Sequence, residues 1–240
     1  MKNVKTFMLV VALIMLLVLA ACSVRNASVD TDTPSEKSSG KIYLYGENHG
    51  VEEILEKELE LWGEYYHKEN MRHLFIESPY YTAELLNLWM QSDSDDIIEE
   101  IYKDWEGTAA HNPYIKEFYK KIKSQYPETI FYGTDIGHQY DTTGQQFLKY
   151  LEENNMENSE QYLLTQEAIE QGKYYYKHSD NVYRENKMVE NFIREFDKLK
   201  NKNIMGIYGG AHTGFDSMDY MTNSVPSMAR QLKERYSENI

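Results

Sequence analysis

The sequence has 240 residues, of which 41% are hydrophobic and 27% are charged, so it is long enough to bury one good hydrophobic core or at most two small ones. Acidic residues outnumber basic residues by 39 to 25, and the net charge of −14 argues against nucleic acid as a partner because phosphates repel an acidic surface. The single cysteine excludes a disulfide framework and a zinc site built on several cysteines.

The first 21 residues have the layout of an export signal. Two lysines precede an apolar run over residues 7–21, and a helix of these 15 residues would span only about 22 Å of the roughly 30 Å hydrocarbon core of a membrane. The sequence LAAC at 19–22 resembles the lipobox of bacterial lipoproteins, in which the cysteine is acylated, for example with palmitate, and becomes the mature N-terminus. This resemblance implies a cleaved signal peptide over 1–21, lipidation at Cys22 and anchoring to the extracytoplasmic face of a cell membrane. The alternative is an uncleaved N-terminal anchor with an incidental cysteine.

Residues 22–40 contain no aromatic side chain and are rich in Ser, Thr, Asp and Asn. Such a segment cannot bury enough apolar surface to order itself, so it is predicted to be a disordered tether. The folded unit is predicted to be a single domain over residues 41–240.

Within this unit, short β-prone segments alternate with longer segments in which apolar residues recur every three or four positions. In chain order the expected elements are a strand at 41–45, helices at 51–66, a strand at 72–77, helices at 79–89, 95–105 and 112–126, a strand at 129–132, helices at 145–154, 159–177 and 181–201, a strand at 203–208 and a helix at 227–236. This alternation predicts an α/β domain with a mainly parallel sheet flanked by helices. In such sheets the ligand cleft lies outside the carboxyl ends of the strands.

The turns that follow the predicted strands collect acids and histidines. They contain Glu47 and His49 after the first strand, Glu77 at the end of the second, and His212 after the last. A histidine in such a turn more often packs or caps than catalyses, so the prediction depends on the joint pattern. Two imidazoles at one sheet edge, with carboxylates that fix their tautomers, are what the activation of a water molecule requires.

Arg184 is the other residue that points to a site. With Met188 and Asn191 it forms a stripe at i, i+4 and i+7 beside the apolar face of its predicted helix. A half-buried arginine needs an anionic partner. That partner is either a glutamate at position 77 or 47, which would only fasten the helix to the sheet, or an oxyanion or carboxylate of a substrate.

Four motifs in order resemble those of a known superfamily. They are GENHG at 46–50, IES at 76–78, RENKMVEN at 184–191 and GGAHTG at 209–214. The superfamily unites erythromycin esterases, the haem-uptake protein ChaN, the Tiki proteases and the PrgY/TraB proteins. Its hallmark is a pair of Gly-x-x-His motifs that flank a glutamate after the second strand and an arginine-led helix. Each motif is short, but the ordered set over about 170 residues is fairly specific.

Matching these motifs residue by residue, the resemblance implies that His49 and His212 are the two motif histidines, Glu77 the strand-end acid and Arg184 the helix arginine. In the esterase branch it implies a metal-free site in which a histidine supported by glutamate activates water. In the Tiki branch it implies a peptidase with Mn²⁺, Co²⁺ or Zn²⁺ bound by the same histidines together with Glu47 and Glu77. In the ChaN branch it implies haem binding. Glu47 fits the Gly-Glu-x-His form of the esterase and ChaN branches better than the Gly-Thr form of Tiki.

Some features depart from the motifs or have no counterpart in them. Glu185 stands where the superfamily commonly has Asp or Asn, and one more strand is expected after the helix at 227–236. Asp135 and His138 are expected at the rim of the cleft, with a structural role as the alternative. Tyrosine runs could stack on a ligand or bind haem iron, but are more simply explained as the cover of helix surfaces. These runs are 65–66, 80–81 and 174–176.

Together these features predict a membrane-anchored extracytoplasmic hydrolase that cleaves an ester or related acyl bond in a small molecule. His49 would take a proton from water, Glu77 would orient an imidazole, Arg184 would hold an anionic oxygen, and His212 would act as acid or second base. Glu47 completes the catalytic set, and the secondary candidates are Asp135, His138 and Asn191. No cofactor is expected in this hypothesis. The metal-dependent peptidase and the haem-binding lipoprotein are the alternatives.

Overall fold

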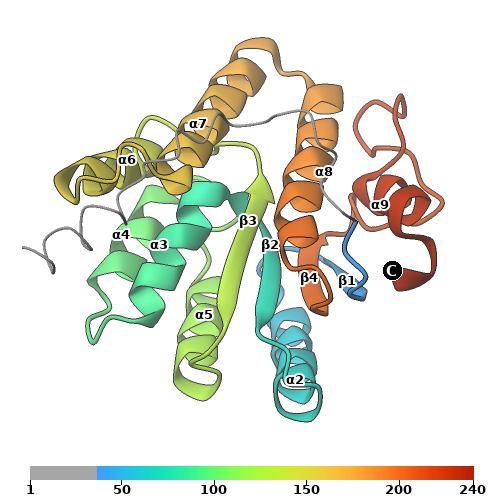
Figure 1. Cartoon of the computed structure of the whole chain (residues 1–240), viewed down its shortest axis with the longest axis horizontal. Coiled ribbons are helices and arrows are strands. Elements are labelled where there is room, and N and C mark those ends of the chain that lie inside the picture. The colour runs from blue at the N-terminus through green and yellow to red at the C-terminus, as the bar shows by residue number, and fades with distance from the viewer. Residues whose placement is uncertain (1–36) are drawn as a thin grey trace, which may run out of the picture. The chain divides into compact units, whose positions relative to one another are not determined.

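The computed structural model describes residues 37–240, which form a parallel β-sheet with helices on both faces (Figure 1). In chain order the elements are β1 (Ile42–Glu47), α2 (Glu52–Lys68), β2 (His73–Pro79), α3 (Tyr80–Met90), α4 (Asp96–Asp104), α5 (Pro113–Gln125), β3 (Ile130–Asp135), α6 (Thr143–Glu153), α7 (Glu160–His178), α8 (Asn181–Lys198), β4 (Ile204–Gly209), α9 (Met228–Tyr236) and a 3₁₀ turn η1 (Ser237–Asn239). The predicted signal peptide, Cys22 and most of the predicted tether lie outside the described residues. Among residues 37–240, no helix is both long enough and apolar enough to cross a membrane.

The sheet has the strand order β1-β4-β2-β3, and every neighbouring pair of strands is parallel. The predicted α/β architecture with a mainly parallel sheet is therefore confirmed. Each strand runs one to three residues further toward its carboxyl end than the sequence pattern indicated. As a result, Glu47 and Asp135 are the last residues of β1 and β3 and lie within the sheet, not in the turns that follow it.

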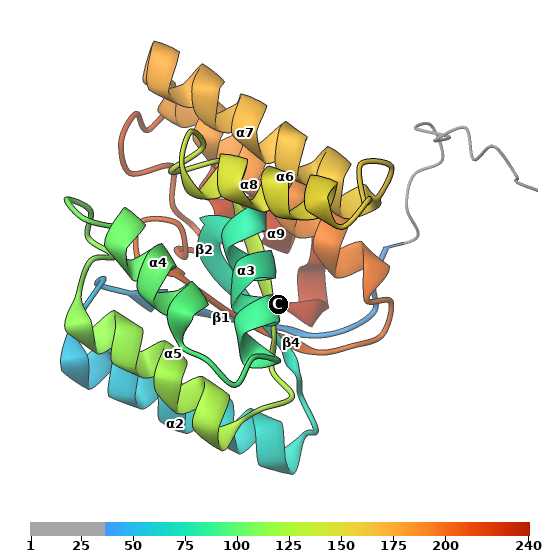
Figure 2. The same cartoon turned by 90° about the vertical axis from the view of Figure 1, so that its left-hand side faces the viewer.

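Side chains that alternate along the strands pack into two separate hydrophobic cores. Leu74 and Ile76 of β2 pack with residues of α2, α3 and α5, whereas Phe75 points to the opposite face. There the Phe75 ring lies 4.9 Å from that of Phe192 on α8, measured between ring centroids. Figure 2 shows α2 and α5 on one side of the sheet and α8 on the other. A third, smaller cluster joins α3 to α6 and α7.

The packed part of the chain begins before Lys41. Ser38 is buried, and its backbone N–H donates to Asp197 Oδ1 at 2.9 Å. The backbone N–H of Ser39 donates to the carbonyl of Lys200 at 2.7 Å. The segment 38–40, which the sequence pattern assigned to the tether, therefore packs against the carboxyl end of α8, because its polar groups find buried partners there.

Candidate active site

The carboxyl edge of the sheet gathers the predicted site residues from different parts of the chain. Glu47 ends β1 and lies beside Gly209, the last residue of β4, because these two strands are paired in parallel. In the same way, the register places Pro79 at the end of β2 beside Asp135 at the end of β3. Parallel pairing thus brings residues that are more than a hundred positions apart to one edge.

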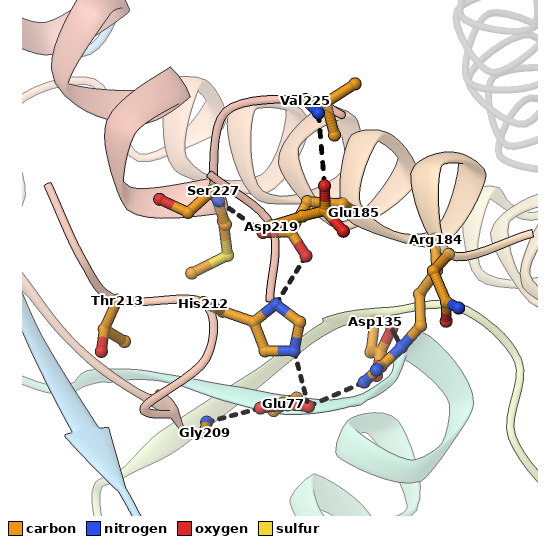
Figure 3. Close-up of polar contacts among 12 residues, drawn as sticks. Glu77, Asp135, Arg184, Glu185, Gly209, His212, Thr213, Asp219, Val225 and Ser227 are labelled. Atoms are coloured by element: carbon orange, nitrogen blue, oxygen red, sulfur yellow. Dashed lines mark hydrogen bonds and ion pairs between the residues drawn. The ribbon is translucent and has the colours of Figure 1, made fainter. Parts of the chain in front are cut away.

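Arg184 of α8 links two of these strand ends. Its Nη2 donates to Glu77 Oε1 at 2.7 Å and to Asp135 Oδ2 at 2.6 Å, and its Nε donates to Asp135 Oδ1 at 3.1 Å. The other oxygen of Glu77 accepts the backbone N–H of Gly209 at 2.5 Å (Figure 3). Of the two partners considered for Arg184, the ion pair with Glu77 is therefore present, and it fastens α8 to the sheet.

The charges of this cluster hold one another in the ionised state. Asp135 is only 1% exposed, and burial by itself would raise its pKa. The charges of Arg184 and His138, with the hydrogen bonds from both, instead lower the pKa of Asp135. Burial likewise acts to lower the pKa of Arg184, but the two carboxylates raise it above its usual value. Both groups are consequently charged at neutral pH.

His212 is held between two glutamates. Its Nδ1 lies 2.6 Å from Glu185 Oε2, and the other oxygen of Glu185 accepts the backbone N–H of Met228 at 2.6 Å (Figure 3). A carboxylate only accepts, so Nδ1 carries the proton. His212 Nε2 lies 3.5 Å from Glu77 Oε1, which is longer than an ordinary hydrogen bond. Burial acts to lower the pKa of His212, but its hydrogen bond to Glu185 and the charge of Glu77 raise it overall.

His49 forms a second pair with a glutamate. Its Nδ1 lies 2.9 Å from Glu47 Oε1, so Nδ1 donates and Nε2 keeps its lone pair. A Cβ atom at Gly209 would lie 3.1 Å from both His49 Nε2 and Glu77 Oε2, which means that the two atoms approach one small space. The hydrogen bond with Glu47 raises the pKa of His49, and burial opposes this effect. The side chain of His49 is 39% exposed, against 13% for His212, so His49 is the more accessible to water.

A cavity of about 310 Å³ lies beside these groups. His49, Glu77 and Arg184 line it, and its apolar wall comes from Trp105, Phe118 and other side chains near α5. His212 instead lines a neighbouring hollow of about 110 Å³, which Arg184 also lines. Glu47 lines the cavity as well, so four of the five predicted catalytic residues share it, and His212 lies next to it, beside Glu77.

The secondary candidates divide between the cavity and the core. Asp135 and His138 line the cavity, and His138 Nε2 lies 2.9 Å from Asp135 Oδ2. The hydroxyl of Tyr176, the one member of the predicted tyrosine runs in this lining, lies 2.5 Å from His138 Nδ1. Asn191 is buried away from the cavity lining, where its Nδ2 donates to the carbonyl of Thr134 and so joins α8 to β3.

The sequence did not point to Glu58, and it marked Glu185 only as a departure from the motif, without a role in the site. Glu58 of α2 is 3% exposed and lines the same cavity. Burial and the nearby charge of Glu47 raise its pKa to about 8. A signal was present in both cases, because Glu58 lies three residues after Leu55, and Glu185 lies three residues before Met188. Each acid thus occupies a position on the buried face of its helix.

The arrangement of donors bears on the metal-dependent alternative. Within residues 37–240, no group of three or more His, Cys, Asp and Glu side chains is placed so that it could hold a metal ion. Glu77, which that alternative requires as a ligand, is already neutralised by Arg184. As they are arranged, these residues do not fit a divalent metal.

Comparison with protein-family models and with curated proteins finds no match. Three solved structures are similar. A Bacillus cereus protein is 13% identical (TM-score 0.55), an erythromycin esterase mutant, EreC, in its open conformation is 9% identical (0.59), and a succinoglycan biosynthesis protein is 17% identical (0.57). Each match covers 83% of this chain, and the chain spans 64%, 68% and 64% of those proteins, respectively. Residues 37–240, with a four-stranded parallel sheet and eight α-helices, thus form a single α/β domain that matches the erythromycin esterase-like fold.

Proposed function

We propose that the protein is a hydrolase that cleaves an ester or related acyl bond in a small molecule with the help of a water molecule activated by His49. The observation that carries this proposal is the His49–Glu47 pair on the wall of the cavity, with Nδ1 bonded to the carboxylate and Nε2 left as an acceptor. The fold similarity to an erythromycin esterase supports the same class of reaction.

In this mechanism His49 Nε2 removes a proton from water as the water attacks the acyl carbon. The Glu47 carboxylate holds the Nδ1–H in place and stabilises the imidazolium that forms. Because the pKa of His49 is raised above 6.5, the base becomes active only above its ordinary titration range. The acidic limb of the pH profile of kcat/KM is therefore expected above pH 6.5.

Arg184 and His212 have different tasks. Nη1 of Arg184 has no hydrogen-bond partner among residues 37–240, so it remains available to the oxyanion that develops on the substrate. His212 does not line the cavity, and we assign it to holding Glu77 in position and exchanging a proton with it.

Membrane anchoring through Cys22 belongs to the same proposal and depends on the lipobox-like sequence at 19–22. Mass spectrometry of the protein produced in a bacterial host tests it. The expected result is an acylated N-terminal cysteine in the membrane fraction. The Cys22→Ser variant is expected to lack the acyl group and to be absent from the membrane fraction. An unmodified Cys22 in the purified protein would contradict the anchor.

His49→Ala tests the hydrolase. On a panel of carboxylic esters, the variant is expected to lose about 10²–10⁴-fold in turnover with a nearly unchanged melting temperature. His178→Ala, which removes an exposed histidine of α7, is the matched control. An unfolded His49→Ala protein would make the residue structural, and full activity would refute the site. Activity that EDTA abolishes and that Mn²⁺, Co²⁺ or Zn²⁺ restores would support the peptidase alternative instead.

A further inference from the structure

One end of the cavity contains buried carboxyl oxygens that accept no hydrogen bond from residues 37–240. Glu47 Oε2 and both carboxyl oxygens of Glu58 are buried, and none of them has a hydrogen-bond partner among residues 37–240. Glu58 is only 3% exposed, and both side chains line the cavity. The other two acids of the lining, Glu77 and Asp135, are paired with Arg184. The unfilled acceptors are therefore concentrated at the end formed by α2 and β1.

The groups around Glu58 do not supply what is missing. Glu47, at the end of β1, raises the pKa of Glu58 by its negative charge, and His49 lowers it only as the weakest of three causes. The other titratable neighbour is Tyr119 of α5, whose pKa is raised by burial and by the charges of both glutamates. His49 already donates its Nδ1–H to the other oxygen of Glu47. No cationic side chain thus faces the pair from α2, β1 or α5.

Unfilled buried acceptors are costly in a folded protein unless a ligand satisfies them. The ligand must offer several donors at one point and carry positive charge, because two carboxyl groups face it. A protonated aliphatic amine has both properties. Trp105 and Tyr119 also line the cavity, and aromatic rings attract a cation placed against their faces.

We propose that the end of the cavity formed by Glu47 Oε2 and the Glu58 carboxyl binds the protonated amino group of the substrate, so that the compound that is cleaved is an ester that also carries an aliphatic amine. Cleavage of the bound compound rests on the proposed hydrolase function, whereas the amine site itself does not. One carboxylate then serves both parts of the ligand. Glu47 Oε1 holds His49, which acts on the ester, and Glu47 Oε2 holds the amine.

Binding of the amine has a proton signature. The pKa of free Glu58 is about 8, so this carboxyl is mostly protonated at pH 7. An ammonium group favours the ionised carboxylate, and the proton of Glu58 leaves to the solvent when the ammonium binds. Each amine that binds at pH 7 is therefore expected to release close to one proton.

Calorimetry with 2-phenylethylamine and with its neutral counterpart 2-phenylethanol tests the site. The protein is titrated at pH 7 in phosphate and in cacodylate, two amine-free buffers whose different ionisation enthalpies reveal the number of protons released. The amine is expected to bind at least 10-fold more tightly than the alcohol, with proton release. Glu58→Gln is expected to weaken amine binding at least 10-fold and to abolish the release.

Glu84→Gln is the matched control, because Glu84 is also a largely buried glutamate with a pKa raised to about 7 but does not line the cavity. It is expected to bind the amine as the unmodified protein does. Equal binding of the alcohol, or undiminished amine binding by a folded Glu58→Gln protein, would overturn the proposal. Glu58-dependent binding of Mn²⁺ or Zn²⁺ alone, without amine binding, would assign the site to a metal and would also overturn it.

Measurements of ester turnover test the amine site and the proposed hydrolase function separately. With a pair of esters that differ only in an aminoalkyl and an alkyl chain, Glu58→Gln is expected to raise KM at least 10-fold more for the amino ester than for the neutral ester. If amines bind but no ester is cleaved, the hydrolase fails and the amine site stands. If esters are cleaved with no preference for an amine, the hydrolase stands and the amine site fails.

Discussion

The two ends of the cavity differ in how their charges are balanced. At one end, Arg184 pairs with both Glu77 and Asp135, and each of its hydrogen bonds ends on a carboxylate. At the other end, Glu58 and one oxygen of Glu47 have no partner among residues 37–240. A buried polar network that is fully satisfied is rigid, whereas one that is partly satisfied needs something else to complete it. The carboxylates of the first end therefore hold Arg184 in place with its Nη1 left for the substrate, whereas the second end has only unfilled acceptors to offer a ligand.

The satisfied end also holds the fold together. Through Glu77, Asp135 and the Gly209 backbone it joins three strands, and through Arg184 it joins them to α8. The next residue on α8, Glu185, extends the connection to the first residue of α9. Changes at this end should therefore affect stability and activity together. Changes at the other end should affect ligand binding without loss of the fold.

The largest expected effect is that of Arg184→Met. This change leaves Glu77 and the buried carboxylate of Asp135 without their cation, so the free energy of unfolding is expected to fall by about 3–5 kcal/mol in urea denaturation. Arg230→Met is the control, because Arg230 makes an exposed ion pair with Glu234, and such pairs contribute about 0–1 kcal/mol. A loss below about 1 kcal/mol for Arg184→Met would remove the distinction between the two ends.

Glu185→Gln should have a smaller effect of about 1–3 kcal/mol. The amide keeps an acceptor for the Met228 N–H but sets an N–H group against the Nδ1–H of His212, so the pKa of His212 should fall. In the unmodified protein the folded pKa of His212 lies above the unfolded value of 6.5. The stability it contributes is therefore complete below pH 6.5 and is lost as the pH rises through the folded pKa.

NMR titration of the His212 ring and urea denaturation across this range check that prediction together. The stability difference between the unmodified protein and Glu185→Gln is expected to be largest below pH 6.5 and to shrink above it. A difference that does not change with pH would mean that Glu185 acts only as an acceptor for the start of α9.

Glu58→Gln should change stability in the opposite direction, by an amount that grows with pH. The pKa of Glu58 is raised from 4.5 to about 8, so the folded protein binds a proton that the unfolded chain releases between these values. The stability of the unmodified protein is consequently lowered as the pH rises from 4.5 to about 8. The Gln variant should match it at the acidic limit and exceed it at pH 8 in urea denaturation. A variant that is less stable at pH 8 would show that Glu58 has a structural partner.

The sequence predicted the strands and the strand-end residues because each strand is short, β-prone and closed by a turn. The position of His49 and His212 at the same edge of the sheet depends further on the pairing of β1 with β4, which no local pattern encodes. His212 faces the neighbouring hollow because its carbonyl accepts the N–H of Ala229 and its ring is held by Glu185, and both contacts are long-range.

The burial of Glu58 and the contact of Glu185 with His212 were not predicted, for a physical reason. An acid on a helix is ordinarily solvated, so the helix periodicity was traced only through apolar residues. Only its spacing, between Leu55 and Trp62, indicated that Glu58 lies on the buried face of α2. The apolar wall near Trp105 could not be predicted either, because the following residues 106–112 have no regular pattern to indicate what they cover.

Gly209 is a position at which one added carbon atom would block the site. Its φ is not positive, so an alanine can adopt the same backbone, and the N–H that holds Glu77 remains in place. The added methyl would lie 3.1 Å from both His49 Nε2 and Glu77 Oε2, where the attacking water would stand. Gly209→Ala would thus plug the reaction centre without altering any charge, and would yield an inert, folded form of the protein suited to trapping its uncleaved ligand.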